Sequence, residues 1–207
     1  MSTPLTAEEL RAAATAGLAS FVDDIERVVA TEDDPHVVAA AVQSRLPALL
    51  ADPSFLAPEY REPWPDRYRS HLLVVAPSRR FSVVSMVWMP GQVTPIHDHI
   101  CWCVVGVLQG FEREQRFSLH ENAAGERWLA PLEEDGVTPG HACALIPPDE
   151  NIHQVRNAGD SLAISIHVYG DDIEVYGSSI NQCFEELPIR PGDLSGTPVA
   201  WRRVNFK

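Results

Sequence analysis

The sequence predicts a mainly β fold, an antiparallel barrel or jelly roll with a helical segment at its N-terminus. Three observations lead to this expectation. Apolar residues recur at helical spacing as far as Leu50, and short runs rich in β-branched residues begin after Tyr68. The segment between them, residues 52–67, contains four prolines and is typical of an irregular connector.

A length of 207 residues is that of a single domain with a sizeable core. We therefore expect one domain with three parts. These are residues 1–67 as helices and connector packed on the barrel, residues 68–187 as the barrel with its functional site, and residues 188–207 as a C-terminal tail.

Two helices are expected before the barrel. Thr6-Ala7-Glu8-Glu9 has the pattern of a capping box, and apolar residues then recur at helical spacing from Leu10 to Val29. A second helix is expected over Pro35–Leu50, because proline is favoured in the first turn and the apolar residues that follow share one face. Both apolar stripes are expected to cover the barrel.

The barrel is expected to be built from short strands separated by turns. The predicted strands are residues 71–76, 81–88, 101–109, 112–119, 142–146, 153–157 and 162–169. The predicted turns are residues 122–125, Asp135-Gly136 and Pro139-Gly140.

The composition limits which binding partners and which cellular compartment are expected. With 16 basic and 29 acidic residues the net charge is −13, which opposes phosphate backbones, so no nucleic-acid partner is expected. No apolar run approaches the ~18 residues of a membrane-spanning helix, and the first residues lack the pattern of a secretory signal. The four cysteines form no paired framework beyond Cys101-x-Cys103, which favours a reducing cytoplasm. The oligomeric state stays open.

The most informative pattern is His97-Asp98-His99, together with a distant third histidine, His153. Successive side chains of a β-strand point to opposite faces, so His97 and His99 would share one face and Asp98 would turn away. Three imidazoles suit Fe, Cu, Ni or Zn, and they leave open positions for a substrate. The pattern therefore predicts a divalent metal site.

The residues around these histidines resemble the two motifs of the cupin superfamily, small double-stranded β-helix barrels with a metal in the mouth. Cys103 occupies the position where many cupins carry a fourth, glutamate ligand, and Glu150 replaces the usual glycine of the second motif. The resemblance implies a cupin barrel with a three-histidine site. It does not define an activity, because the fold hosts many chemistries. The flanking positions of the motifs are Gly91, Gly110, Pro148 and Asn157.

A narrower resemblance runs from about Tyr68 to Tyr169. His-Asp-His, the third histidine and Ser165-Ile166-His167-Val168-Tyr169 follow one another in this order. In these features the chain resembles the cysteine dioxygenase family, iron enzymes that oxidise small thiols to sulfinates and include bacterial 3-mercaptopropionate dioxygenases. The resemblance implies Fe(II) bound by the three histidines, with O₂ and a small cysteine-like or 3-mercaptopropionate-like thiol as substrates.

Ser165, His167 and Tyr169 alternate along one expected strand and would share a face. A hydroxyl can orient an imidazole, which in turn can polarise a phenol. By resemblance, these three residues would be catalytic and Tyr169 would hydrogen-bond the substrate or oxygen. The alternative is a hydrogen-bonded strand face without a catalytic role.

Cys103 has two interpretations. It has the strand parity of His97 and His99, so it is expected to face inward unless a bulge intervenes. In animal cysteine dioxygenases a cysteine near this position forms a thioether with the active-site tyrosine. Cys103 matches it only if one residue is deleted after His99, and otherwise Val104 aligns. A Cys103–Tyr169 crosslink is thus one hypothesis, and a buried apolar cysteine is the other.

The substrate anchor departs from the family pattern. Animal enzymes carry an arginine two residues after a tyrosine, and the mercaptopropionate-type enzymes carry glutamine there. In this chain Tyr68 is followed by Arg69 and then Ser70, which cannot make the bidentate clamp of an arginine. Either the register slips and Arg69 points inward, or the substrate is anchored elsewhere.

Two other classes of function stay open. A different metal-dependent cupin enzyme could act on a non-thiol, but it would have no evident use for Ser165, His167 and Tyr169. A non-catalytic metal- or ligand-binding cupin would bind without consuming O₂.

Overall fold

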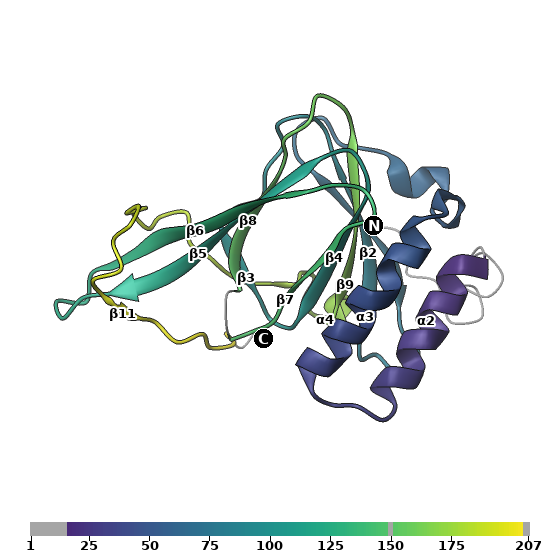
Figure 1. Ribbon diagram of the computed structural model, residues 1–207, viewed down its shortest axis with the longest axis horizontal. Helices are drawn as coiled ribbons and strands as arrows, with labels where there is room; N and C mark the ends of the chain where they lie inside the picture. The colour runs from purple at the N-terminus through teal and green to yellow at the C-terminus, as the bar shows by residue number, and fades with distance from the viewer. Residues whose placement is uncertain (1–15, 149–150, 205–207) are drawn as a thin grey trace.

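The computed structural model describes residues 16–148 and 151–204, which form two antiparallel sheets facing each other with two helices against one of them (Figure 1). This confirms the predicted mainly β class with N-terminal helices. The expected capping box at Thr6–Glu9 lies outside the described residues.

The helices are α2 (Ala16–Val29) and α3 (Pro35–Leu50). The predicted second helix is confirmed at both of its ends. Asp34 caps α3 by accepting a hydrogen bond from the His36 amide at 2.9 Å. Two short 3₁₀ helices, η1 (Pro53–Phe55) and η2 (Pro58–Arg61), occupy the proline-rich connector. The apolar faces of α2 and α3 share one core with the first sheet.

The first sheet has the order β1-β2-β9-β4-β7. One of its faces lies under the helices and the other lines the barrel interior, which is why β2 and β9 are buried at every position. Gly106 in β4 lets α3 approach closely, since a Cβ there would lie 2.7 Å from Leu50 Cδ1. The strands are β1 (Arg69–Val75), β2 (Ser82–Trp88), β4 (Cys103–Gln109), β7 (Ala142–Leu145) and β9 (Ala163–Tyr169).

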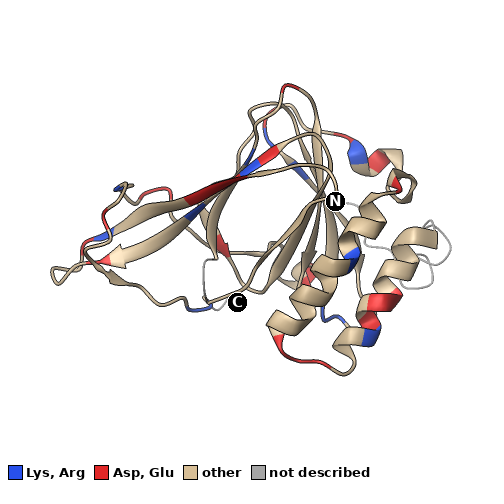
Figure 2. Ribbon diagram, viewed as in Figure 1, with Lys and Arg blue, Asp and Glu red and all other residues tan. Residues whose placement is uncertain are grey.

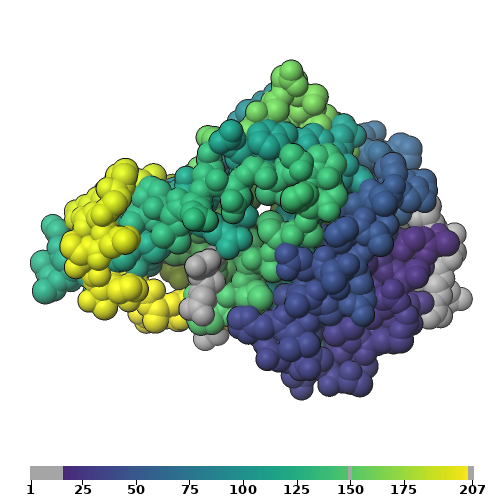
Figure 3. All heavy atoms as spheres, in the orientation of Figure 1, coloured from purple at the N-terminus to yellow at the C-terminus, as the bar shows by residue number. Residues whose placement is uncertain are grey.

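The second sheet has the order β10-β3-β8-β5-β11, and β6 also pairs with β5. Its strands are β3 (His97–His99), β5 (Glu112–Glu121), β6 (Arg127–Val137), β8 (Ile152–Asn157), β10 (Ile180–Cys183) and β11 (Thr197–Pro198). A short helix, α4 (Ile173–Tyr176), leads from β9 towards β10. The C-terminal segment lies against the long β5–β6 hairpin, where Trp128 Nε1 donates to the Asp193 carbonyl at 2.9 Å (Figure 3).

The predicted turn at Asp135-Gly136 is wrong, because both residues lie inside β6 and pair with β5. Cross-strand pairing to a long neighbour has overridden the local preference of Asp-Gly for a turn. The polar, proline-containing sequence of β6 does not alternate, so periodicity gave no signal for it. Strands β10 and β11 were also not predicted. The turns at residues 122–125 and at Pro139-Gly140 are confirmed.

Charge is distributed unevenly over the fold. Strands β2, β4, β7 and β9 contain no Lys, Arg, Asp or Glu, whereas α2 and the β5–β6 hairpin carry both signs (Figure 2). Among the described residues, no helix combines the length and apolar character needed to cross a membrane.

Candidate metal centre

The structure brings His97, His99 and His153 together inside the barrel. His97 and His99 lie on β3, and His97 is the direct cross-strand partner of His153 on β8. One ring nitrogen of each lies within 4.8 Å of those of the other two, and all three side chains are buried. These three imidazoles form a compact donor set at the meeting point of two strands.

The protonation of these rings suits a metal. Burial, with a further contribution from His153, lowers the pKa of His97 to about 3, and burial also holds the pKa of His99 well below its usual range. Both rings are therefore neutral near pH 7. The Nδ1–H of His97 donates to the Pro95 carbonyl at 2.9 Å, which leaves the lone pair on Nε2.

The donor atoms also fit a cation by their position. His153 donates from Nδ1 to Glu114 and so presents a lone pair on Nε2, which lies 2.9 Å from His99 Nε2. A divalent ion satisfies converging imidazole lone pairs, and imidazole suits iron, copper, nickel and zinc. The residues present thus fit a three-histidine metal site.

Glu114 supports this site from β5 and was missed by the sequence analysis. Its Oε1 accepts from His153 Nδ1 at 2.9 Å and lies 3.5 Å from Arg116 Nε. Burial alone would raise the pKa of Glu114, but the hydrogen bond from His153 and the electrostatic interactions with His153 and Arg116 outweigh it and lower this pKa to about 2. A carboxylate that orients a ligating histidine is a recurrent feature of metal sites. Strand β5 contains several acidic residues, so the sequence alone does not single out Glu114. Only the cross-strand register shows that Glu114 lies beside His153.

We expect Glu114→Gln to weaken metal binding about 10- to 100-fold, because a neutral amide fixes the His153 ring less strongly than a carboxylate does. Competition with a chromophoric chelator measures the affinity. The matched control is Glu121→Gln, which changes an exposed carboxyl on the same strand and leaves the affinity unchanged.

A row of hydrogen-bonded side chains on β9 lies beside the three histidines. The Ser165 Oγ and His167 Nε2 atoms are 3.0 Å apart, and His167 Nδ1 is 3.1 Å from the Tyr169 hydroxyl. The donor-only Trp88 Nε1 donates to Ser165 Oγ at 3.2 Å, which leaves the serine hydrogen for His167 or for the Glu112 carboxyl. The ring centroids of Tyr169 and His99 are 5.5 Å apart. The three residues thus form one continuous row leading to the metal site.

The electrostatics keep this row neutral. Burial lowers the pKa of His167 to about 3 and holds the pKa of Tyr169 well above its usual range. The imidazole is therefore unprotonated and the phenol retains its hydrogen near pH 7. A neutral phenol at this place can donate a hydrogen bond into the cavity.

Glu112, on β5, is a buried carboxyl that the sequence analysis also missed. Burial raises its pKa to about 8, although a hydrogen bond with Ser165 acts in the opposite direction. Its Oε1 has no hydrogen-bond partner among the described residues. The side chain is therefore held largely as the neutral acid near pH 7.

We expect Glu112→Gln to gain thermal stability relative to the parent protein as the pH rises from 5 to 8. The folded-state pKa of Glu112 lies above the unfolded value of 4.5, so unfolding releases a proton in this range. The free energy of unfolding then falls with pH by up to about 1.4 kcal/mol per unit. Glutamine lacks this dependence. Melting temperatures at several pH values measure the effect, with Glu121→Gln as the control. The prediction would be contradicted if the melting temperatures of the parent protein and of Glu112→Gln changed with pH by the same amount.

Cys103 faces the same interior. It is the direct cross-strand partner of Tyr169, and its Sγ lies 4.0 Å from His167 Nδ1. Val104 packs instead in the core shared with the helices. The expected inward direction of Cys103 assumed one continuous strand from His97 to Cys103. The chain instead crosses from β3 of one sheet to β4 of the other. Cys103 nevertheless reaches the inner face.

A cavity of about 150 Å³ opens above the three histidines. Tyr68 lines it and packs on Trp88, with ring centroids 4.7 Å apart, and Ser70 also lines it. Arg69 turns away: it pairs with Glu62 at 3.5 Å, and its guanidinium lies 5.2 Å from the Trp64 ring centroid. The expectation that Arg69 could point inward is therefore corrected, because β1 keeps its alternation through Ser70.

Solved structures similar to this chain include the following proteins, at low identity and over about half of the chain. The protein TT1209 from Thermus thermophilus is 20% identical, with a TM-score of 0.39, over 55% of this chain and 91% of that one. A conserved Klebsiella pneumoniae protein with a double-stranded beta-helix domain is 18% identical, with a TM-score of 0.41, over 55% and 85%. A cupin-superfamily sugar phosphate isomerase from Silicibacter pomeroyi is 24% identical, with a TM-score of 0.39, over 50% and 59%.

The family comparison covers far more of the chain. The family described as cysteine dioxygenase type I matches residues 17–176. This range runs from α2 to α4 and includes the three histidines, Glu114 and the β9 row. The chain therefore belongs to the cysteine dioxygenase type I family.

Proposed function

We propose that the protein is a non-heme iron thiol dioxygenase, which incorporates both atoms of O₂ into a small thiol and gives a sulfinate. The overall change converts RSH and O₂ to RSO₂⁻ and a proton. The observation that supports it best is the adjacency of three buried imidazoles to the hydrogen-bonded row Ser165, His167 and Tyr169. Family membership supports the same reaction class.

In this proposal His97, His99 and His153 hold Fe(II). When bound, a dipositive ion with three neutral ligands supplies open positions and lowers the pKa of a coordinated thiol. Glu114 fixes the His153 ring through its 2.9 Å hydrogen bond. Met86, Trp88 and Val155, which line the cavity, are buried and limit the access of water to the reacting sulfur.

The β9 row positions a proton. Trp88 donates to Ser165 and Glu112 is largely neutral near pH 7, so in this proposal the single Ser165 hydrogen goes to His167 Nε2. The imidazole hydrogen then lies on Nδ1, facing the Tyr169 oxygen. The phenol hydrogen of Tyr169 is then available to a group in the cavity. Tyr169 is thus the proposed catalytic residue, with His167 and Ser165 behind it.

We further propose that Cys103 and Tyr169 form a thioether. The bond would join Sγ to a ring carbon of Tyr169 as the S–H and C–H bonds break, and O₂ would accept the two hydrogens with their two electrons to give H₂O₂. Direct cross-strand pairing of the two residues supports it. We expect the intact mass to fall by about 2 Da and one linked peptide to contain both residues. Unlinked peptides from fully active enzyme would show that the crosslink is not required.

The first test is O₂ uptake by anaerobically prepared, Fe(II)-loaded protein with a panel of thiols. The panel contains cysteine, cysteamine, 3-mercaptopropionate and mercaptosuccinate, with sulfinate detected by mass spectrometry. Uptake matched by sulfinate would support the dioxygenase. Iron binding without uptake for any thiol would reject it, in favour of another cupin enzyme or a binding module.

We also propose a reducing, cytoplasmic setting. None of the four cysteines is in a disulfide, although three of them, Cys101, Cys103 and Cys143, pack in or against one cluster of the barrel interior. Free thiols persist in reducing compartments, whereas secreted domains tend to pair their cysteines.

A further inference from the structure

We propose that the native substrate is a small thiol whose other end is uncharged, such as a hydroxyl or an amide, and that the site disfavours thiols bearing a carboxylate. This inference rests on the proposed dioxygenase function and narrows its substrate class. It follows from the walls of the cavity, from the arginines around it and from its two exposed serines.

The walls of the cavity carry no compensating charge. Apart from the histidines, the described residues that line it are apolar side chains, glycine or hydroxyl-bearing side chains, and none is Lys, Arg, Asp or Glu. Strands β2, β4, β7 and β9 of the first sheet are equally free of such residues (Figure 2). A carboxylate placed against these walls, away from the metal that the histidines would hold, would give up hydration without an ionic partner among the side chains.

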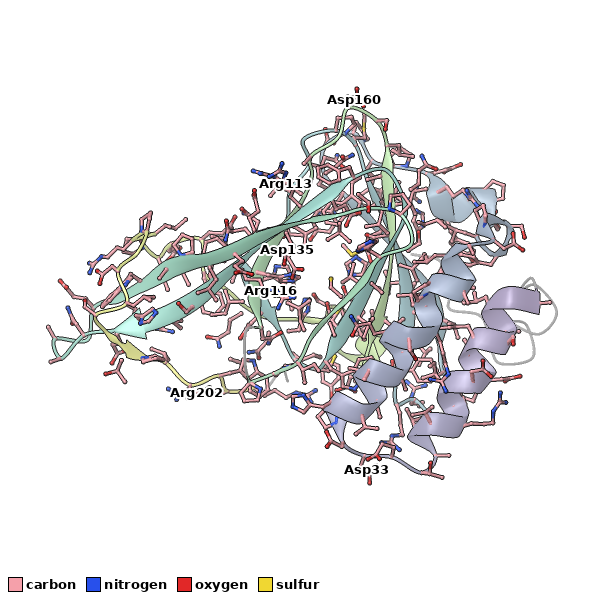
Figure 4. The ribbon with its side chains drawn as sticks, viewed as in Figure 1. Asp33, Arg113, Arg116, Asp135, Asp160 and Arg202 are labelled. Carbon is pink, nitrogen blue, oxygen red and sulfur yellow. The ribbon has the colours of Figure 1, made fainter. Side chains whose placement is uncertain are left out.

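The arginines near the cavity are engaged elsewhere. Arg69 pairs with Glu62 on the outer side of β1, and Arg79 contacts the Asp172 carboxylate at the start of α4. Arg116 points into the space between β5 and β7, where it lies 3.5 Å from Glu114 Oε1 and donates to the Ala144 carbonyl at 3.5 Å (Figure 4). Arg116 does not line the cavity over the histidines. A carboxylate could recruit one of these guanidiniums only by breaking an existing ion pair.

Two exposed serines supply the polar contacts instead. Ser70 on β1 and Ser178 ahead of β10 both line the cavity. Ser178 Oγ accepts from the Ile180 amide at 3.1 Å, so its hydrogen is free to donate. Hydroxyls both donate and accept, which matches an alcohol or amide, whereas a carboxylate only accepts and needs several donors or a cation. The chain's net charge of −13 adds a repulsive field for anions.

The test compares 3-mercaptopropionate with 3-mercaptopropionamide, which has nearly the same shape but no charge. Sulfinate formation by Fe(II)-loaded protein gives kcat/KM for each. Anaerobic titration of Co(II)-loaded protein, followed by thiolate-to-cobalt absorption, gives each Kd without turnover. We expect the amide to show about tenfold higher kcat/KM and about tenfold lower Kd, the scale set by one unsatisfied polar group.

A matched pair of variants tests whether the cavity wall at Ser70 sets the preference between the amide and the carboxylate thiol. Ser70→Arg places a guanidinium on the cavity wall and is expected to reverse the preference towards the carboxylate. His71→Arg places the same group on the other face of β1, where His71 now contacts the Glu62 carbonyl at 3.1 Å, and is expected to leave the preference unchanged. Melting temperatures of both variants establish that they are folded.

The outcomes separate this proposal from the proposed function. Equal or better use of 3-mercaptopropionate by the parent protein would overturn the uncharged substrate and leave the dioxygenase standing. Tighter binding of the amide to the cobalt protein, with no sulfinate from either thiol, would support the uncharged ligand and reject the dioxygenase. Equal binding and no sulfinate would overturn both.

Discussion

Replacing His153 with alanine is expected to abolish metal retention and thiol turnover. His153 is the proposed ligand that connects the site to Glu114, through a 2.9 Å hydrogen bond, and it is the cross-strand partner of His97. Removing it leaves two imidazoles and takes from the buried Glu114 carboxylate its donor at 2.9 Å, while Arg116 and Cys143 stay at 3.5 Å. We expect metal affinity to fall by more than about 100-fold, beyond the range typical of losing an outer hydrogen bond. Metal content after gel filtration and O₂ uptake measure the two effects.

The matched control is His141→Ala, which removes an exposed histidine on the approach to β7. It is expected to retain metal and activity. His97→Ala and His99→Ala are expected to behave like His153→Ala. Full activity in any of these three variants would overturn the metal assignment, whereas the weaker effect of Glu114→Gln distinguishes loss of a ligand from loss of its orientation.

Replacing Tyr169 with phenylalanine is expected to lower kcat by about 100-fold while metal content stays unchanged. The substitution removes only the hydroxyl, which lies 3.1 Å from His167 Nδ1 and close to the His99 ring. Because burial keeps this phenol protonated, the lost function is a neutral hydrogen-bond donor rather than a charge. Steady-state kinetics on Fe(II)-loaded protein would show the loss.

Tyr176→Phe is the control for this variant, because Tyr176 lies on α4 outside the cavity and stacks against Arg203, with the guanidinium 4.9 Å from its ring centroid. It is expected to keep the parent kcat. Unchanged kcat in Tyr169→Phe as well would remove the catalytic role of the β9 row. It would leave Ser165, His167 and Tyr169 as a structural strand face.

The pattern of residues was sufficient for much of the fold. The helix over Pro35–Leu50 follows from a proline at its start and apolar residues at helical spacing, and these signals are local. Strands β2, β4 and β9 follow from short runs of β-branched residues. Strand β6 does not alternate, and only its pairing with β5 makes it a strand. Local sequence is a good guide where it agrees with tertiary pairing and fails where pairing overrides it.

By itself, the sequence determined which side chains were available for chemistry. His97 and His99 two residues apart, and Ser165, His167 and Tyr169 two residues apart, fix shared faces because side chains alternate along a strand. Only the tertiary structure decided which faces meet. Strand register set His97 opposite His153 and Cys103 opposite Tyr169, placed Glu114 behind a ligand, and turned Arg69 away from the cavity. Register depends on contacts between residues far apart in the chain, and those contacts leave no periodic trace in the sequence.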